Sequence, residues 1–84
     1  MYELIFDEEA IKYLEKLPQQ TSKRIFKKLN NAKKEPHRYF ERLTNRKEYK
    51  LRVGEYRLIA DITKSKLIIY IITIGHRKNI YKKL

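Results

Sequence analysis

Residues 67–74 read LIIYIITI, a run in which every side chain is aliphatic, aromatic or β-branched. Such residues favour strands, and a continuous apolar run of this length is typical of a central strand covered on both faces. The run is much shorter than the roughly 18 apolar residues of a membrane helix, and no other segment approaches that length. We therefore expect it to form the middle of a sheet, ending at Gly75, and we expect no membrane span.

Three further segments alternate apolar and polar residues, which is the period of a strand. They are residues 2–6, residues 49–53 and residues 56–62. Gly54-Glu55 between the last two is typical of a two-residue hairpin loop, which places Val53 opposite Tyr56 and Arg52 opposite Arg57. Residues 63–66, TKSK, are expected to form the next turn.

Two segments have helical periodicity instead. Asp7 is a suitable cap for a helix with apolar positions at Ala10, Ile11, Leu14 and Leu17, which Pro18 ends. From about Gln20 to Lys34, an apolar stripe of Ile25, Phe26, Leu29 and Ala32 predicts a second helix. Residues 35–47 have no sustained period and are interpreted as an ordered loop, and the tail after Gly75 is too short to assign.

The predicted order is strand, two helices, three strands and a tail. This order favours an α+β fold: a mainly antiparallel sheet of about four strands with an N-terminal helical hairpin packed on one face. The 84 residues suit one domain, residues 1–84, with a modest core.

The charge is strongly basic and unevenly distributed. The chain has 21 Lys and Arg against 10 Asp and Glu, and residues 18–57 hold thirteen of the bases and four of the acids. Such asymmetry points to a polyanionic partner, nucleic acid first, then an acidic protein or a membrane surface; a solvated lysine-rich surface is the alternative. The absence of cysteine excludes disulfides and thiolate chemistry, and the acidic N-terminus differs from a signal peptide, so a cytoplasmic location is expected.

The hairpin is the best candidate for a site. If its apolar residues face the helices, Lys50, Arg52 and Arg57 project from the opposite face, and Arg77 lies just beyond the central strand. Arg52 and Arg57 repel each other across the strands, an arrangement that suits a bound anion such as phosphate. Each cation alone fits a solvated surface charge or a structural ion pair. The four cations together predict anion binding, but the pattern alone does not predict catalysis.

Other catalytic motifs are absent. With glycine only at positions 54 and 75, there is no phosphate-binding loop, and His37 and His76 lack metal-ligand spacing. The acids of the first helix, Glu8, Glu9 and Glu15, suit capping and solubility. We expect no metal ion and no organic cofactor.

The sequence resembles the RelE/ParE superfamily of toxins from toxin–antitoxin systems along nearly its whole length. The matching segments are YELIFDEEAIKYLEKLP, the basic second helix, RLTN at 42–45, YKLRVGEYRLIADI and LIIYIITIGHRKNIY. The combination of LRVGEYR with IGHRKNIY is the most specific of these. The resemblance implies the RelE-like fold, in agreement with the periodicity.

In the RelE branch, the resemblance further implies a ribosome-dependent endoribonuclease, or mRNA interferase, that cuts mRNA in the A site without a metal. The ribose 2′-OH attacks the adjacent phosphate and leaves a 2′,3′-cyclic phosphate and a 5′-OH. Arg57 and Arg77 would then stabilise the transition state, Lys50 and Arg52 would act as proton acceptor and phosphate clamp, and Tyr81 would stack on a nucleotide or pack on the sheet. Further RNA contacts are expected from Arg46, Lys47, His76 and Lys78.

The resemblance also has departures. Some RelE proteins carry another lysine where this chain has Glu48, so the general base stays open between Lys50, Tyr81 and His76. A ParE-like toxin that inhibits DNA gyrase, or an inactive antitoxin-binding homologue, is the alternative function. Each of these functions implies an acidic RelB-like antitoxin as the partner, in a toxin–antitoxin heterotetramer.

Overall fold

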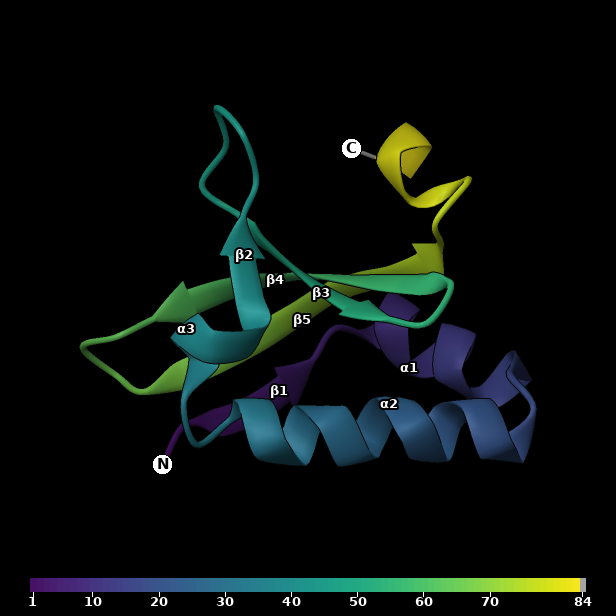
Figure 1. Ribbon diagram of the computed structural model, residues 1–84, viewed down its shortest axis with the longest axis horizontal. Coiled ribbons are helices and arrows are strands. Elements are labelled where there is room, and N and C mark those ends of the chain that lie inside the picture. The colour runs from purple at the N-terminus through teal and green to yellow at the C-terminus, as the bar shows by residue number, and fades with distance from the viewer. Residues whose placement is uncertain (84) are drawn as a thin grey trace.

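The computed structural model describes residues 1–83, with the side chains of Tyr81 and Lys83 outside the description. Figure 1 shows two helices under one face of a sheet, with the β2–β3 loop and the C-terminal turn rising from the other face. The predicted α+β class is confirmed. In chain order the elements are β1 (Glu3–Phe6), α1 (Glu8–Lys16), α2 (Gln19–Ala32), α3 (Pro36–Tyr39), β2 (Phe40–Arg42), β3 (Tyr49–Val53), β4 (Tyr56–Thr63), β5 (Ile68–His76) and the 3-10 helix η1 (Ile80–Lys83).

The sheet has five strands in the order β1-β5-β4-β3-β2. The β1–β5 pair is parallel, and the other three pairs are antiparallel. The apolar run therefore lies inside the sheet between β1 and β4, as its composition predicts. The expectation of about four strands missed β2.

The β3–β4 hairpin has the predicted register. Arg52 lies opposite Arg57 and Val53 opposite Tyr56. Gly54 has a φ of +57°, the left-handed conformation that a two-residue hairpin loop needs at its first position. Because the side-chain period of a strand is two, this register decides which residues of both strands face the helices.

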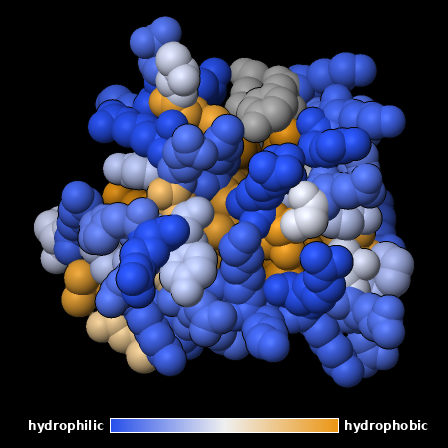
Figure 2. Space-filling view, in the orientation of Figure 1, coloured by the Kyte–Doolittle hydropathy of each residue, from blue (hydrophilic) through white to orange (hydrophobic). Residues whose placement is uncertain are grey.

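The core lies between the sheet and helices α1 and α2. Ala10 and Leu14 of α1 and Ile25 and Leu29 of α2 are buried against the apolar positions of the strands. Ile11 and Phe26, which also belong to the predicted stripes, are 46% and 43% exposed, and the Phe26 ring packs on Phe6 at the border of the core. In Figure 2, hydrophilic residues cover most of the visible face and hydrophobic ones show mainly between them. No helix in the described chain is long and apolar enough to cross a membrane.

The interpretation of residues 35–47 as a loop was wrong in its first half. Pro36–Tyr39 form the single-turn helix α3, and Phe40–Arg42 form the edge strand β2. Both elements are too short to display a period. Tertiary contacts stabilise them instead, since Phe40 is 6% exposed and pairs with Leu51 of β3.

The prediction for the central strand also needs two corrections. Strand β5 continues through Gly75 to His76, because these residues still pair with Arg57 and Tyr56. Its side chains are not buried throughout: Ile68, Tyr70 and Ile72 are only half-buried. A bulge next to the Ile59–Thr73 pair leaves Ile72 without a cross-strand partner and reverses the facing of the residues that follow. Beyond the bulge, Thr73 and Gly75 lie on the face away from the helices.

Asp7 joins α1 to β5. Its carboxylate accepts hydrogen bonds from the Glu9 backbone N–H at 3.0 Å and from the Tyr70 hydroxyl at 2.7 Å. These bonds, that of Tyr70 foremost, hold the pKa of Asp7 below its ordinary value of 3.8. A carboxyl whose pKa is lower in the folded state stabilises the fold above its unfolded pKa, and this stabilisation disappears as the pH falls through the folded pKa.

We therefore predict that Asp7→Ala lowers the thermal midpoint at pH 7 and flattens its decline between about pH 5 and pH 2. Thermal melts over this pH range measure both effects. Glu15→Ala, which removes an exposed carboxylate of the same helix, should keep the slope of the parent protein. An Asp7→Ala protein with the parent's acid slope contradicts the assignment.

Candidate active site

Two rows of side chains cross the face of the sheet that points away from the helices. Strand register places Glu41 of β2 beside Lys50 of β3, and Lys50 beside Ile59 of β4. Two residues further along, Arg52 of β3 lies beside Arg57 of β4. The core residues of the same strands alternate with these, so the face is defined by the register alone.

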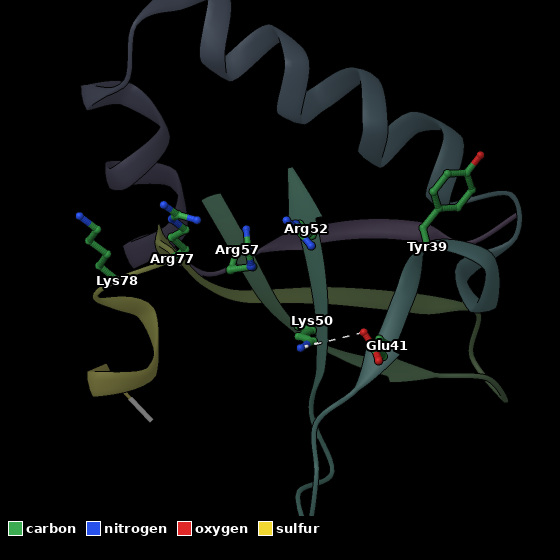
Figure 3. Close-up of a pocket in the computed structure, with 7 residues that line it drawn as sticks. All are labelled: Tyr39, Glu41, Lys50, Arg52, Arg57, Arg77 and Lys78. Atoms are coloured by element: carbon green, nitrogen blue, oxygen red, sulfur yellow. Dashed lines mark ion pairs between the residues drawn. The ribbon is translucent and has the colours of Figure 1, made fainter. Parts of the chain in front are cut away.

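A cleft of about 430 Å³ opens over these rows. The prediction that four cations from the hairpin and the end of β5 share one surface is confirmed (Figure 3). The described residues that line the cleft include five cationic side chains and one carboxylate, which makes it strongly electropositive. Its lining residues are Tyr39, Glu41, Lys50, Arg52, Arg57, Arg77 and Lys78.

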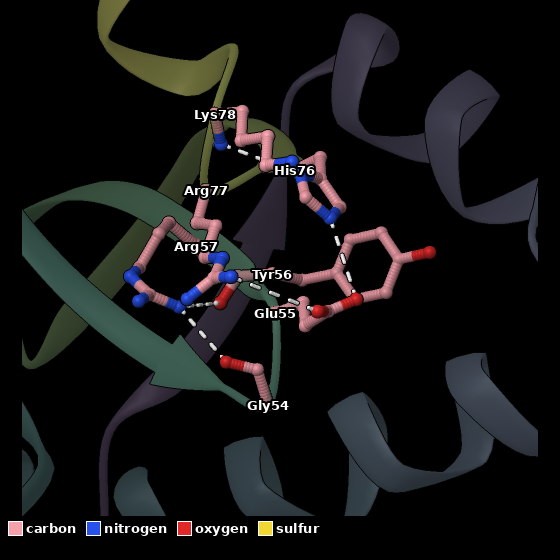
Figure 4. Close-up of polar contacts among 7 residues, drawn as sticks. All are labelled: Gly54, Glu55, Tyr56, Arg57, His76, Arg77 and Lys78. Carbon is pink, nitrogen blue, oxygen red and sulfur yellow. Dashed lines mark hydrogen bonds and ion pairs between the residues drawn. The ribbon is translucent and has the colours of Figure 1, made fainter.

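Arg57 is oriented by the turn of its own hairpin. One guanidinium nitrogen, Nη1, donates to the carbonyl oxygens of Gly54 and Tyr56 at 2.9 and 3.0 Å (Figure 4). A guanidinium has five N–H donors, so this anchoring leaves donors for a ligand. Within residues 1–83, no carboxylate forms an ion pair with Arg52 or Arg57. The repulsion across the hairpin is therefore not cancelled by an internal acid.

Arg77 is held against the same turn by the backbone. Its N–H donates to the Glu55 carbonyl at 2.7 Å, and its Nη2 lies 4.0 Å from the Glu55 carboxylate. The chain then turns into η1, where Ile80 is fully buried over Gly75. A Cβ at residue 75 would lie 3.0 Å from Ile80 Cδ1, so glycine allows this close approach without a shift of the Ile80 side chain. These contacts place Arg77 and Lys78 at one end of the cleft.

His76, predicted to bind RNA, does not line the cleft. Its ring packs edge-on against Tyr56, with 5.8 Å between the centroids. Its Nε2 lies 3.4 Å from the Glu55 carboxylate, and its Nδ1 accepts from the Lys78 N–H at 3.3 Å. In Figure 4, its ring points away from Arg57 and Arg77. The strand period predicts this outcome, because neighbours along β5 face opposite sides.

Arg46 and Lys47, also predicted to bind RNA, lie in the β2–β3 loop on a separate hollow of about 420 Å³. The Arg46 guanidinium lies 3.1 Å from the Glu48 carboxylate. A backbone N–H and this guanidinium hold the pKa of Glu48 below its usual value. Tyr81, predicted to stack on a nucleotide, lies in η1, but its side chain is outside the described part.

Two residues of the cleft were not among the predicted site residues. Tyr39 is 37% exposed at the end of α3, and Glu41 projects from β2 with its Oε2 at 4.0 Å from Lys50 Nζ. Both fall in the segment interpreted as a loop. Recognising Phe40 as the buried residue of a short strand would have placed its neighbour Glu41 on the cleft face. Of the described residues, no group of three or more His, Asp or Glu is arranged to hold a metal ion.

Solved structures that resemble this fold are RelE toxins, alone or in complex with an antitoxin. The E. coli RelBE toxin–antitoxin complex matches with 30% identity and a TM-score of 0.76, over 90% of this chain and 96% of that one. RelBE2 of Mycobacterium tuberculosis matches with 25% identity and a TM-score of 0.79, over 90% and 98%. The isolated E. coli RelE toxin matches with 27% identity and a TM-score of 0.75, over 99% and 94%. The fold and its cationic face thus define a RelE-like toxin.

A family model described as the ParE toxin of the type II toxin-antitoxin system parDE matches residues 4–81. The chain belongs to the RelE/ParE superfamily and is a toxin of a type II toxin–antitoxin system. A comparison with curated protein sequences found no match.

The uncompensated Arg52–Arg57 pair leads to a stability prediction. Arg52→Gln should raise the free energy of unfolding by about 0.2–1 kcal/mol at low salt, since it removes a like charge directly opposite Arg57. The gain should shrink between about 20 and 500 mM salt, because salt screens exposed charges. Urea unfolding at both salt concentrations measures it. Lys27→Gln on the outer face of α2 is the matched control. An equal rise in its free energy of unfolding would show that the effect comes from net charge alone and not from the Arg52–Arg57 pair.

Proposed function

We propose that this toxin is a ribosome-dependent endoribonuclease that cleaves mRNA in the A site. The observation that carries the proposal is the cleft, where Arg52, Arg57 and Arg77 converge with Lys50. In the part of the chain that the structure describes, no carboxylate forms an ion pair with Arg52 or Arg57. Guanidinium groups bind phosphate with several donors at once. Their positive charge also stabilises the extra negative charge that a phosphoryl group acquires during transfer.

The proposed reaction is transesterification by the ribose 2′-OH, which needs neither a metal ion nor an organic cofactor. Arg57, anchored by its two carbonyl contacts, and Arg77 stabilise the pentavalent phosphorus. Arg52 and Lys50 hold the phosphate from β3, and Lys78 binds the strand at the C-terminal end of the cleft. In this proposal Tyr81 stacks on a nucleotide, and Arg46 and Lys47 contact RNA outside the cleft.

The test is mRNA cleavage on programmed ribosomes by single-residue variants. Arg57→Ala and Arg77→Ala should each slow cleavage by about 10²- to 10³-fold, the usual effect of removing one preorganised donor. Both side chains lie at the surface of the sheet, so circular dichroism should remain that of the parent. Lys27→Ala, on the opposite side of the molecule, should cleave normally. Full activity of both arginine variants would falsify the proposal.

Inhibition of DNA gyrase by binding is the second candidate, favoured by the match to the ParE family model. The similarity to solved RelE toxins, such as the isolated E. coli toxin, favours the ribosome as the target. A supercoiling assay and a translation assay with the same preparation separate the two targets. Inhibition of supercoiling with intact mRNA assigns the ParE activity, and mRNA cleavage with normal supercoiling assigns the RelE activity.

The proposed partner is an acidic RelB-like antitoxin, in a heterotetramer in the cytoplasm. Relatives from E. coli and M. tuberculosis were crystallised as RelBE complexes, and the net charge of +11 suits an acidic partner. We predict that affinity for the antitoxin encoded beside this gene falls as salt is raised, and falls further in Arg57→Ala. Titration calorimetry at two salt concentrations measures both. Salt-independent binding places the antitoxin away from the cleft.

A further inference from the structure

Tyr39 is the one aromatic side chain among the described residues that line the cleft. In Figure 3 it stands at the β2 end, and Arg52 and Arg57 lie between it and Arg77 at the other end. The residue is 37% exposed. Among the described residues, no ring pair includes Tyr39, and none forms a hydrogen bond with its hydroxyl. The exposed part of the ring is therefore available to a ligand in the cleft.

The backbone of Tyr39 is held on both sides by buried neighbours. Pro36, which begins α3, is fully buried, and Phe40, which begins β2, is 6% exposed. The Phe40 N–H closes the single turn of α3 by donating to the Pro36 carbonyl. With the backbone held, a tyrosine has two side-chain torsions left to fix, so ordering its ring against a ligand costs little conformational entropy.

The strand register places Tyr39 in one row with the two arginines of the hairpin. Phe40 of β2 pairs with Leu51 of β3. One residue before Phe40, Tyr39 falls beside Arg52, which pairs with Arg57. Neighbouring strands are about 4.8 Å apart, so the Tyr39 backbone is roughly 5 Å from that of Arg52 and roughly 10 Å from that of Arg57. If a phosphate binds between the two guanidinium groups, the base attached to it through the ribose reaches the ring.

We propose that Tyr39 is a stacking platform for the mRNA base next to the scissile phosphate, an inference that rests on the proposed function above. Unstacked bases of single-stranded RNA stack on aromatic side chains. Every base has a flat π-face, so the contact accepts all four bases. Adenine and guanine, with two fused rings, overlap the tyrosine more fully than cytosine and uracil. Tyr39 therefore adds affinity and a moderate preference for a purine, and it takes no part in proton or phosphoryl transfer.

The first experiment measures kcat and KM for mRNA cleavage on programmed ribosomes. Tyr39→Leu removes the aromatic face and keeps an apolar side chain, so we expect KM to rise by about 5- to 150-fold, the usual effect of losing one base stack. Because the catalytic cations are untouched, kcat should stay within about threefold of the parent. Tyr39→Phe keeps the ring and should keep the parent's KM. Phe26→Leu, which removes an exposed ring of α2 outside the cleft, is the matched control and should cleave normally.

Three outcomes of this experiment overturn the inference. The first is a Tyr39→Leu protein with the parent's KM while Arg57→Ala is slow, which leaves the proposed function intact. The second is an equal loss in Tyr39→Phe, which assigns the role to the hydroxyl. The third is a fall in kcat with an unchanged KM. A parent protein that cleaves no mRNA on ribosomes overturns the proposed function and this inference together.

The second experiment separates a stack from a residue that only supports the shape of the cleft. The probe is mRNA with fluorescent 2-aminopurine at one A-site position and a 2′-O-methyl group on the attacking ribose, which blocks cleavage. Stacking quenches 2-aminopurine, so the parent and Tyr39→Phe should quench it beside the scissile phosphate, and Tyr39→Leu should quench it less. Equal quenching by all three proteins at every position overturns the inference.

The purine preference is tested in the same variants. Exchanging the purine at the quenched position for a pyrimidine should raise the KM of the parent severalfold and leave that of Tyr39→Leu nearly unchanged. A preference that survives in Tyr39→Leu contradicts the assignment to this ring. Weaker antitoxin binding by Tyr39→Leu, with cleavage at the parent's KM, overturns the inference and identifies Tyr39 as a contact for the protein partner.

Discussion

The register of the β3–β4 hairpin is the constraint on which the rest of the structure depends. The Gly54-Glu55 turn pairs Arg52 with Arg57 and Leu51 with Leu58. A shift of one residue would exchange the faces of both strands, sending guanidinium groups into the core and leucines into water. Burial of Leu51 and Leu58 therefore forces the two arginines together on the opposite face. The core supplies the free energy that holds a repulsive pair in place.

The second determinant is the bulge at Ile72. Before it, Ile69 and Ile71 pack against the helices; beyond it, Ile74 takes their place, and Thr73 and Gly75 turn to the cleft side. That reversal leaves a small residue under the C-terminal turn, where Ile80 seats on Gly75. Arg77 thereby stays beside the hairpin turn, where its N–H donates to the Glu55 carbonyl. A backbone irregularity in β5 therefore completes a site begun by β3 and β4.

Sequence reasoning succeeded where one local rule acted alone. The hairpin register followed from the two-residue loop and the period of two, and the shared face of Lys50, Arg52 and Arg57 followed from it. The reasoning failed where a tertiary contact decided the outcome. Strand β2 exists because Phe40 is buried beside Leu51, and three residues cannot display a period. Because β2 was missed, Glu41 was missed too, the one acid among the described residues that line the cleft.

The fold holds two of the cleft's cations, Arg57 and Arg77, in fixed positions. Arg57 is held by the carbonyls of its own turn and Arg77 by a backbone bond to Glu55, so both guanidinium groups are positioned before a ligand arrives. Preorganised charge costs no reorganisation during a reaction. Repulsion between Arg52 and Arg57 raises the energy of the empty site, and a phosphate between them lowers it. The same repulsion therefore weakens the free protein and strengthens its complex with any anion placed there, whether the RNA backbone or an acidic partner.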